Sequence, residues 1–191
     1  MANRKTKKLY DDSWMYILLL TTLTILLYSL STYKFTVSNL ELSYSLLGLP
    51  IIYFISNYIT KKYSYAKTVT AISVSGVSMV LYVLIMNFAL GKATILSSIS
   101  GHFCAYVVSQ FVNLMTYYFL QQNTKSPLLL VFINYIFSLI VFNMFYTLIH
   151  LNMMVQDGYW KGYFISLVIQ SVVSMSLSLV DKTLVKRGRD E

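Results

Sequence analysis

The chain has 191 residues, of which 57% are hydrophobic and only 12% are charged. Soluble domains carry about 25% charged residues and expose much of their surface to water, so this composition excludes an ordinary soluble globule and indicates a protein of the lipid bilayer. The net charge is +8, but the basic residues lie at the chain ends and in short gaps, so no nucleic-acid-binding face is expected.

Six stretches without Asp, Glu, Lys or Arg divide the chain, and each is long enough to cross the hydrocarbon core. Backbone polar groups inside a bilayer must bond within their own segment, which favours helices. The stretches lack the short alternating pattern of an outer-membrane barrel. The sequence therefore predicts an all-α integral membrane protein, one domain over residues 1–191, folded as a six-helix transmembrane bundle. The predicted spans are 14–33, 45–60, 68–90, 93–120, 127–150 and 163–180.

The first, second and fifth predicted spans each have a distinctive local sequence. The first follows a basic N-terminal segment as in a signal peptide, but its apolar run is long and no small-residue cleavage site follows, so we expect an uncleaved span. The second is interrupted by Gly48 and Pro50, which leaves open a re-entrant or irregular piece within 36–50. In the fifth, Ser126 followed by Pro127 is typical of a helix N-cap.

The distribution of basic residues predicts the orientation. With the N-terminus inside, 12 of the 15 Lys and Arg residues fall in inside segments, as the positive-inside rule requires. Trp14 and Trp160 fall at predicted boundaries, where interfacial aromatic residues are common. We expect a multi-pass protein of the cytoplasmic membrane with both termini cytoplasmic.

The fourth span carries a polar stripe whose members recur every three or four residues and so share one helix face. Such a face can line a hydrated cavity, or it can bond neighbouring helices together; the sequence supports both interpretations equally. The stripe consists of His102, Tyr106, Ser109, Gln110, Asn113 and Tyr117.

Motifs for catalysis are missing from the sequence. There is no GxxxxGK[ST] phosphate loop, no HExxH, no GxSxG and no pair of membrane aspartates, so we expect neither an enzyme nor a bound cofactor or metal. Aromatic and amide side chains suit a neutral, planar, hydrogen-bonding solute, whereas an ionic solute would need fixed charges at membrane depth.

Residues 46–87 resemble the second and third spans of the VUT family of queuosine-precursor transporters. Leu49–Pro50 is followed by Asn57 and then by Tyr63–Ser64, and Ser109–Gln110 is followed by Asn113. The family has Asp where this chain has Asn57 and Asn113, and often a lysine at the position of Ser166.

The resemblance implies a transporter that imports a deazaguanine base or its nucleoside. The hydrogen-bonding or stacking groups expected to bind this solute are Asn57, His102, Tyr106, Gln110, Asn113, Asn134 and Gln170.

Two other functions stay open. One is a substrate-binding subunit of an energy-coupling-factor vitamin importer, which would borrow ATPases from partners. The other is a non-transport membrane scaffold or assembly protein, whose polar stripes only pack helices together. The expected partners are the bilayer and a small-molecule substrate, with a homodimer or an energising ATPase module as further candidates.

Overall fold

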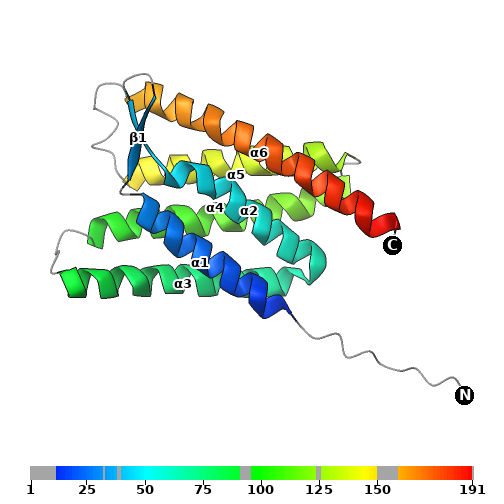
Figure 1. The fold of residues 1–191 in the computed structure, drawn as a ribbon, viewed down its shortest axis with the longest axis horizontal. Helices are drawn as coiled ribbons and strands as arrows, with labels where there is room; N and C mark the ends of the chain where they lie inside the picture. The colour runs from blue at the N-terminus through cyan, green and yellow to red at the C-terminus, as the bar shows by residue number, and fades with distance from the viewer. Residues whose placement is uncertain are drawn as a thin grey trace, which may run out of the picture.

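The computed structural model describes residues 12–31, 33–37, 40–90, 96–123, 126–149 and 159–190. Long helices dominate this part of the chain, and one short antiparallel hairpin joins the first two (Figure 1). The elements in chain order are α1 Ser13–Leu30, β1 Lys34–Val37, β2 Leu40–Ser43, α2 Ser45–Lys62, α3 Tyr65–Leu90, α4 Leu96–Asn123, α5 Pro127–Ile149 and α6 Tyr159–Asp190.

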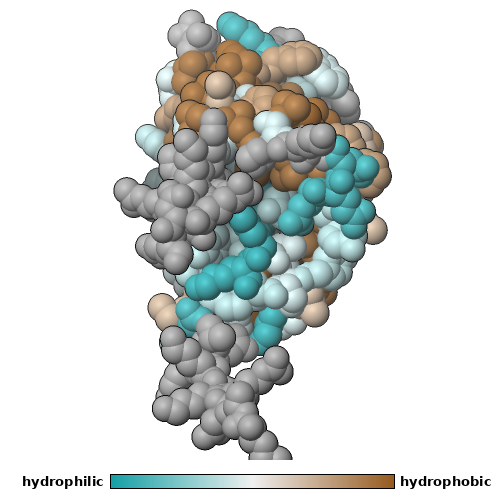
Figure 2. Space-filling view, turned by 90° about the vertical axis from the view of Figure 1, so that its right-hand side faces the viewer, coloured by the Kyte–Doolittle hydropathy of each residue, from teal (hydrophilic) through white to brown (hydrophobic). Residues whose placement is uncertain are grey.

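Successive helices run in opposite directions along one bundle, so the described chain begins and ends at the same end of it (Figure 1). We call this the lysine end, because the α2–α3 turn there carries Lys61, Lys62 and Lys67. The opposite end, which carries the β1–β2 hairpin, is called the hairpin end. Figure 2 looks onto the lysine end and shows hydrophilic residues across its middle, with hydrophobic surface along its upper flank.

Five of these helices, α1, α3, α4, α5 and α6, are long and apolar enough to cross a membrane. A multi-pass helical bundle is therefore confirmed. The helix predicted as the second span exists as α2, but it is not among the five, so exactly six spans are not shown. Its composition differs because α2 packs against each of the other five helices. Polar residues such as Ser56 and Asn57 then face protein instead of lipid.

The region of 36–50 differs from the expected re-entrant or irregular piece. Its described residues form the hairpin, in which Lys34 pairs with Ser43 and Val37 with Leu40, and then the start of α2. The hairpin was not predicted, and it qualifies the all-α assignment. Pro50 lies inside α2 on its buried side, where its missing amide removes one helical hydrogen bond.

Other helix boundaries agree with the prediction to within a few residues, with two differences. The first helix ends at Leu30, because residues from Lys34 onward pair as a strand. The last helix extends beyond the predicted 163–180 at both ends. The predicted N-cap at Ser126 is confirmed, since its carbonyl accepts the Leu130 amide at 3.0 Å and its hydroxyl accepts the Leu129 amide at 3.5 Å. Predicted span residues 93–95 and 150 lie outside the described residues.

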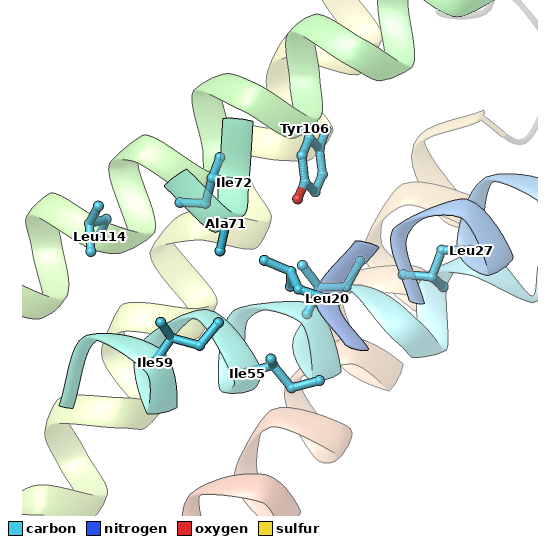
Figure 3. Packing of buried hydrophobic residues seen from close by; sticks show 9 residues of the cluster. Leu20, Leu27, Ile55, Ile59, Ala71, Ile72, Tyr106 and Leu114 are labelled. Atoms are coloured by element: carbon cyan, nitrogen blue, oxygen red, sulfur yellow. The ribbon is translucent and has the colours of Figure 1, made fainter. Parts of the chain in front are cut away.

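Two apolar clusters hold the bundle together. The first joins α1, α2, α3 and α4 through residues such as Leu20, Ile59, Ile72 and Leu114 (Figure 3). The second joins α2, α4 and α5 around Tyr53 and its neighbours. Many large apolar side chains remain exposed on the outer helix faces, far more than a water-soluble monomer shows, which is the pattern expected of surface that lipid covers.

Candidate functional site

The seven predicted site residues do not form one pocket. Two of them line a cavity, three form a cluster of asparagines, and the two glutamines, Gln110 and Gln170, belong to neither group. The polar stripe of α4 is divided between the first two groups, so one part of it lines a cavity and another part bonds helices together. The two interpretations of this stripe therefore apply to different halves of it.

His102 and Tyr106 line a cavity near the hairpin end. It lies between the end of α1, the start of α2, α3, the first half of α4 and the second half of α5. Its volume of about 40 Å³ has room for roughly three waters, at ~10–15 Å³ each. Its lining residues are Thr24, Leu27, Tyr28, Ser31, Ser45, Leu49, Ile52, Met79, His102, Tyr106 and Phe142.

The wall of the cavity is almost entirely apolar, because the hydroxyls of its lining residues bond within the protein. The His102 ring makes edge contacts with Tyr28 of α1 at 5.4 Å and Tyr146 of α5 at 4.7 Å between ring centroids. The Tyr106 hydroxyl lies 2.6 Å from Ser75 Oγ and accepts the Thr24 hydroxyl at 3.4 Å. Among the described lining residues none is a carboxylate, a lysine or an arginine. Such a lining can pack against an uncharged, flat molecule, and a hydroxyl can bond that molecule only by leaving its present partner.

Asn57, Asn113 and Asn134, which we call the amide cluster, bond directly across α2, α4 and α5. Asn113 Nδ2 donates to Asn57 Oδ1 at 2.9 Å, and Asn57 Nδ2 donates back to Asn113 Oδ1 at 3.4 Å. Asn134 Nδ2 also donates to Asn113 Oδ1, at 2.6 Å. All three side chains are buried. The cluster ties three helices together, as interhelical amides do in membrane proteins.

Gln110 lies one helical turn before Asn113 on the same face of α4. Its Oε1 accepts the Ser56 hydroxyl of α2 at 2.9 Å, whereas its Nε2 has no partner in the described structure. Asn134 Oδ1 is unpartnered in the same way. Buried amides normally satisfy both ends, so these two atoms mark a place where the closed bundle is incompletely bonded.

Gln170 belongs to neither group. It accepts a hydrogen bond from Asn143 Nδ2 at 3.3 Å, which links α6 to α5. Asn143 was not among the predicted residues, and neither were the aromatic partners of His102. Tyr28 and Tyr146 carried no distinguishing signal, because the chain has 17 tyrosines and only the tertiary packing brings these two to His102.

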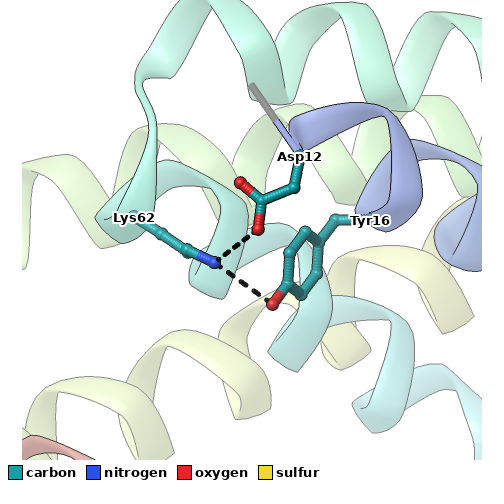
Figure 4. A network of polar contacts seen from close by, with 3 residues as sticks. All are labelled: Asp12, Tyr16 and Lys62. Carbon is teal, nitrogen blue, oxygen red and sulfur yellow. Dashed lines mark hydrogen bonds and ion pairs between the residues drawn. The ribbon is translucent and has the colours of Figure 1, made fainter. Parts of the chain in front are cut away.

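A further polar cluster, which the sequence did not indicate, lies at the lysine end. Lys62 Nζ lies 3.3 Å from Asp12 Oδ2 and donates to the Tyr16 hydroxyl at 3.3 Å (Figure 4). The ammonium also lies over the rings of Tyr16 and Tyr63, at 4.8 and 5.1 Å from their centroids. A hydrogen bond to its own backbone and the contact with Lys62 lower the pKa of Asp12.

The described residues contain no group of three or more His, Cys, Asp or Glu side chains placed to hold a metal ion. No family model matches the chain, and the comparisons with curated proteins and with solved structures find no match either. Membership of the VUT family therefore stays a prediction from the residues quoted above.

Proposed function

We propose that this protein transports a small, neutral, planar solute across the membrane, and that the cavity beside His102 and Tyr106 receives it. The observation that carries the proposal is the lining of that cavity, which includes aromatic side chains and, among the described residues, no carboxylate, lysine or arginine. Aromatic rings stack on flat molecules, and the lining hydroxyls would bond a solute only by giving up their present partners. The amides Asn57, Gln110, Asn113 and Asn134 lie nearer the lysine end, whereas Gln170 contacts Asn143 of α5.

The proposal requires the cavity to widen when solute binds. The present free volume of about 40 Å³ suits a few waters at ~10–15 Å³ each, whereas a planar heterocycle is several times larger. Binding pockets in transporters change shape as they alternate between the two sides, so a narrow cavity is compatible with one state of such a cycle.

The proposed membrane arrangement has six crossings, with α2 as the sixth, in the cytoplasmic membrane. The lysine end is cytoplasmic, together with both termini. Two findings support this arrangement: α2 leads from the hairpin to the lysine end and packs against all five other helices, and Lys61, Lys62 and Lys67 gather at the end where the described chain starts and finishes, as the positive-inside rule favours.

A queuosine precursor is the first cargo to test, because the resemblance to the VUT family names it. The experiment compares transfer-RNA queuosine content in a host lacking this chain with the same host expressing it, at limiting precursor. We expect queuosine to be restored by the native chain and reduced by His102→Ala at equal membrane abundance. Unchanged queuosine between the two hosts would eliminate this cargo.

A scaffold role is the second candidate, and the amide cluster favours it, because its members bond one another across three helices. Such a protein needs no solute. The purified protein is reconstituted in proteoliposomes and tested for uptake of neutral heterocycles, and its partners are purified from the native membrane. Absence of uptake together with a stable partner protein would support the scaffold role. Recovery of ATPase subunits would instead support the energy-coupling-factor type of importer.

A further inference from the structure

We propose that the amide cluster is the gate that closes the cavity toward the lysine end. This inference rests on the proposed function, because it assigns the closure of the same solute path. The gate residues are Asn57 of α2, Asn113 of α4 and Asn134 of α5. Their mutual hydrogen bonds hold three helices together in the closed state, and opening breaks those bonds.

The position of the cluster along the bundle is the first argument. On α4, Asn113 follows the cavity residue Tyr106 by seven positions toward the lysine end, which is about 10 Å at 1.5 Å per residue. On α2, Asn57 follows the cavity residue Ile52 by five positions, or about 7.5 Å. On α5, which runs the other way, Asn134 precedes Phe142 of the cavity. Three helices therefore place the cluster on the same side of the cavity.

The side chains of the amide cluster are packed tightly against one another. Asn113 and Asn134 have no exposed surface, and Asn57 is only 4% exposed. The three contacts between them range from 2.6 to 3.4 Å, so solute has no free passage between these side chains in the described state.

The unpartnered atoms supply the third argument, and they point to a second state. Gln110 Nε2 is a donor and Asn134 Oδ1 is an acceptor. Both atoms are buried, and neither has a hydrogen-bond partner among the residues that the structure describes. A buried polar atom without a hydrogen bond costs free energy. Water or solute entering this level would supply the missing bonds. The hydrogen bonds between the three asparagines therefore hold the closed state, and the two unpartnered atoms reduce the free energy needed to open it.

In this proposal Lys62, Asp12 and Tyr16 form an outer lid. They lie one to two turns beyond the amide cluster, where the end of α2 meets the start of α1 (Figure 4). The lid is partly exposed, with 37% and 45% of the Lys62 and Asp12 side chains accessible. A test of the gate must therefore remove the lid first.

The test measures thiol accessibility from each side of the membrane, and needs no knowledge of the cargo. The full-length chain carries Cys104→Ser, Lys62→Met and Ser45→Cys, and sealed vesicles of each orientation receive a membrane-impermeant thiol reagent. Ser45 is a half-buried lining residue of the cavity at the start of α2. With the cluster intact, we expect the thiol at position 45 to react from the hairpin end only. Adding Asn113→Ala should raise labelling from the lysine end at least about tenfold, because lost hydrogen bonds shift the closed–open equilibrium.

The matched control is Asn143→Ala, which removes a buried asparagine of α5 that bonds Gln170 and lies outside the cluster. It should leave labelling from the lysine end unchanged. Asn134→Ala is the second gate variant, should Asn113→Ala not insert. The gate is refuted if position 45 reacts equally from both ends with the cluster intact, or if neither inserted gate variant changes the labelling.

The gate and the transport proposal fail in different ways. Gated labelling in a protein that takes up no solute would remove the transport proposal and leave the gate in place. Solute uptake with labelling that ignores the amide cluster would remove the gate and leave transport in place.

Discussion

At the scale of single residues, Gly48 shows why a helix with poor local propensity forms here. A methyl group on its Cα would lie 1.9 Å from Leu27 Cδ2 and 2.7 Å from Leu27 Cγ. Glycine weakens a helix interior by about 1 kcal/mol relative to alanine, but at this position it lets α2 approach α1 beside the cavity. The residue that made the second span doubtful in the sequence is the residue that brings two helices together.

Gly48→Ala should therefore lower stability by about 1–3 kcal/mol, the usual cost of overpacking. Thermal unfolding in detergent measures the effect. Leu27→Ala in the same chain should restore part of it by making room for the methyl group. Gly162→Ala is the matched control, since its nearest contact would be an ordinary 3.9 Å from Leu42. Equal unfolding temperatures for the Gly48 and Gly162 variants would contradict this account.

Gln110 and Asn113 lie one turn apart on α4 but should respond differently to leucine. Asn113→Leu leaves Asn57 and Asn134 without their main partner and should destabilise the protein by about 1–3 kcal/mol. Gln110→Leu removes an unpartnered Nε2, and Ser56 keeps its bond to the Ile52 carbonyl, so stability should hardly change. Unfolding curves of both variants measure these two changes in stability. If the functional proposal is right, Gln110→Leu also inserts normally and loses uptake.

At the scale of elements, α2 shows the limit of hydropathy as a guide to membrane helices. Its 18 residues include two lysines at the end and polar residues in the middle. Its uncharged stretch predicted a span, but α2 is not among the helices that are long and apolar enough to cross a membrane. Only three of its residues, Ile51, Lys61 and Lys62, are exposed. A helix surrounded by other helices faces little lipid, so it can carry the polar groups that a site or gate needs.

The contact between Asp12 and Lys62 joins the start of α1 to the end of α2, and it should depend on pH. The folded-state pKa of Asp12 is lowered from 3.8, so the contact contributes stability that is complete above about pH 4, near the unfolded value. This contribution is lost as the pH falls through the lower folded pKa. Hydrogen-exchange protection of the first turn of α1, corrected for intrinsic rates, should therefore decrease when the pH is lowered below about 4.

Asp12→Asn is the control for this effect. It removes the titrating group, so protection of the first turn should be weaker at neutral pH and should no longer change on acidification. An acid-dependent loss that persists unchanged in Asp12→Asn would assign the effect to another group.

At the scale of the whole molecule, the alternating directions of the helices make a prediction about topology. If α2 crosses the membrane, Lys61 lies on the same side as the N-terminus, and Lys34 and Lys161 lie on the opposite side. Single-cysteine variants at these positions, made in Cys104→Ser, should react with an impermeant reagent from opposite faces of sealed vesicles. Reaction of positions 34 and 61 from the same face would show that α2 does not cross.

The sequence alone determined that lipid surrounds the protein and where most of its helices lie. Long uncharged stretches require lipid and helices, because lipid leaves backbone groups no external partner, and five of the predicted spans have the length and composition to cross. The tertiary structure decided the hairpin, the central place of α2 and the division of the polar residues. Asn113 bonds Asn57 and Asn134, which are 56 and 21 residues away in the chain, whereas Gln170 bonds Asn143 instead. Helical spacing shows which residues share a face of one helix, but the contact between two faces depends on how the helices pack.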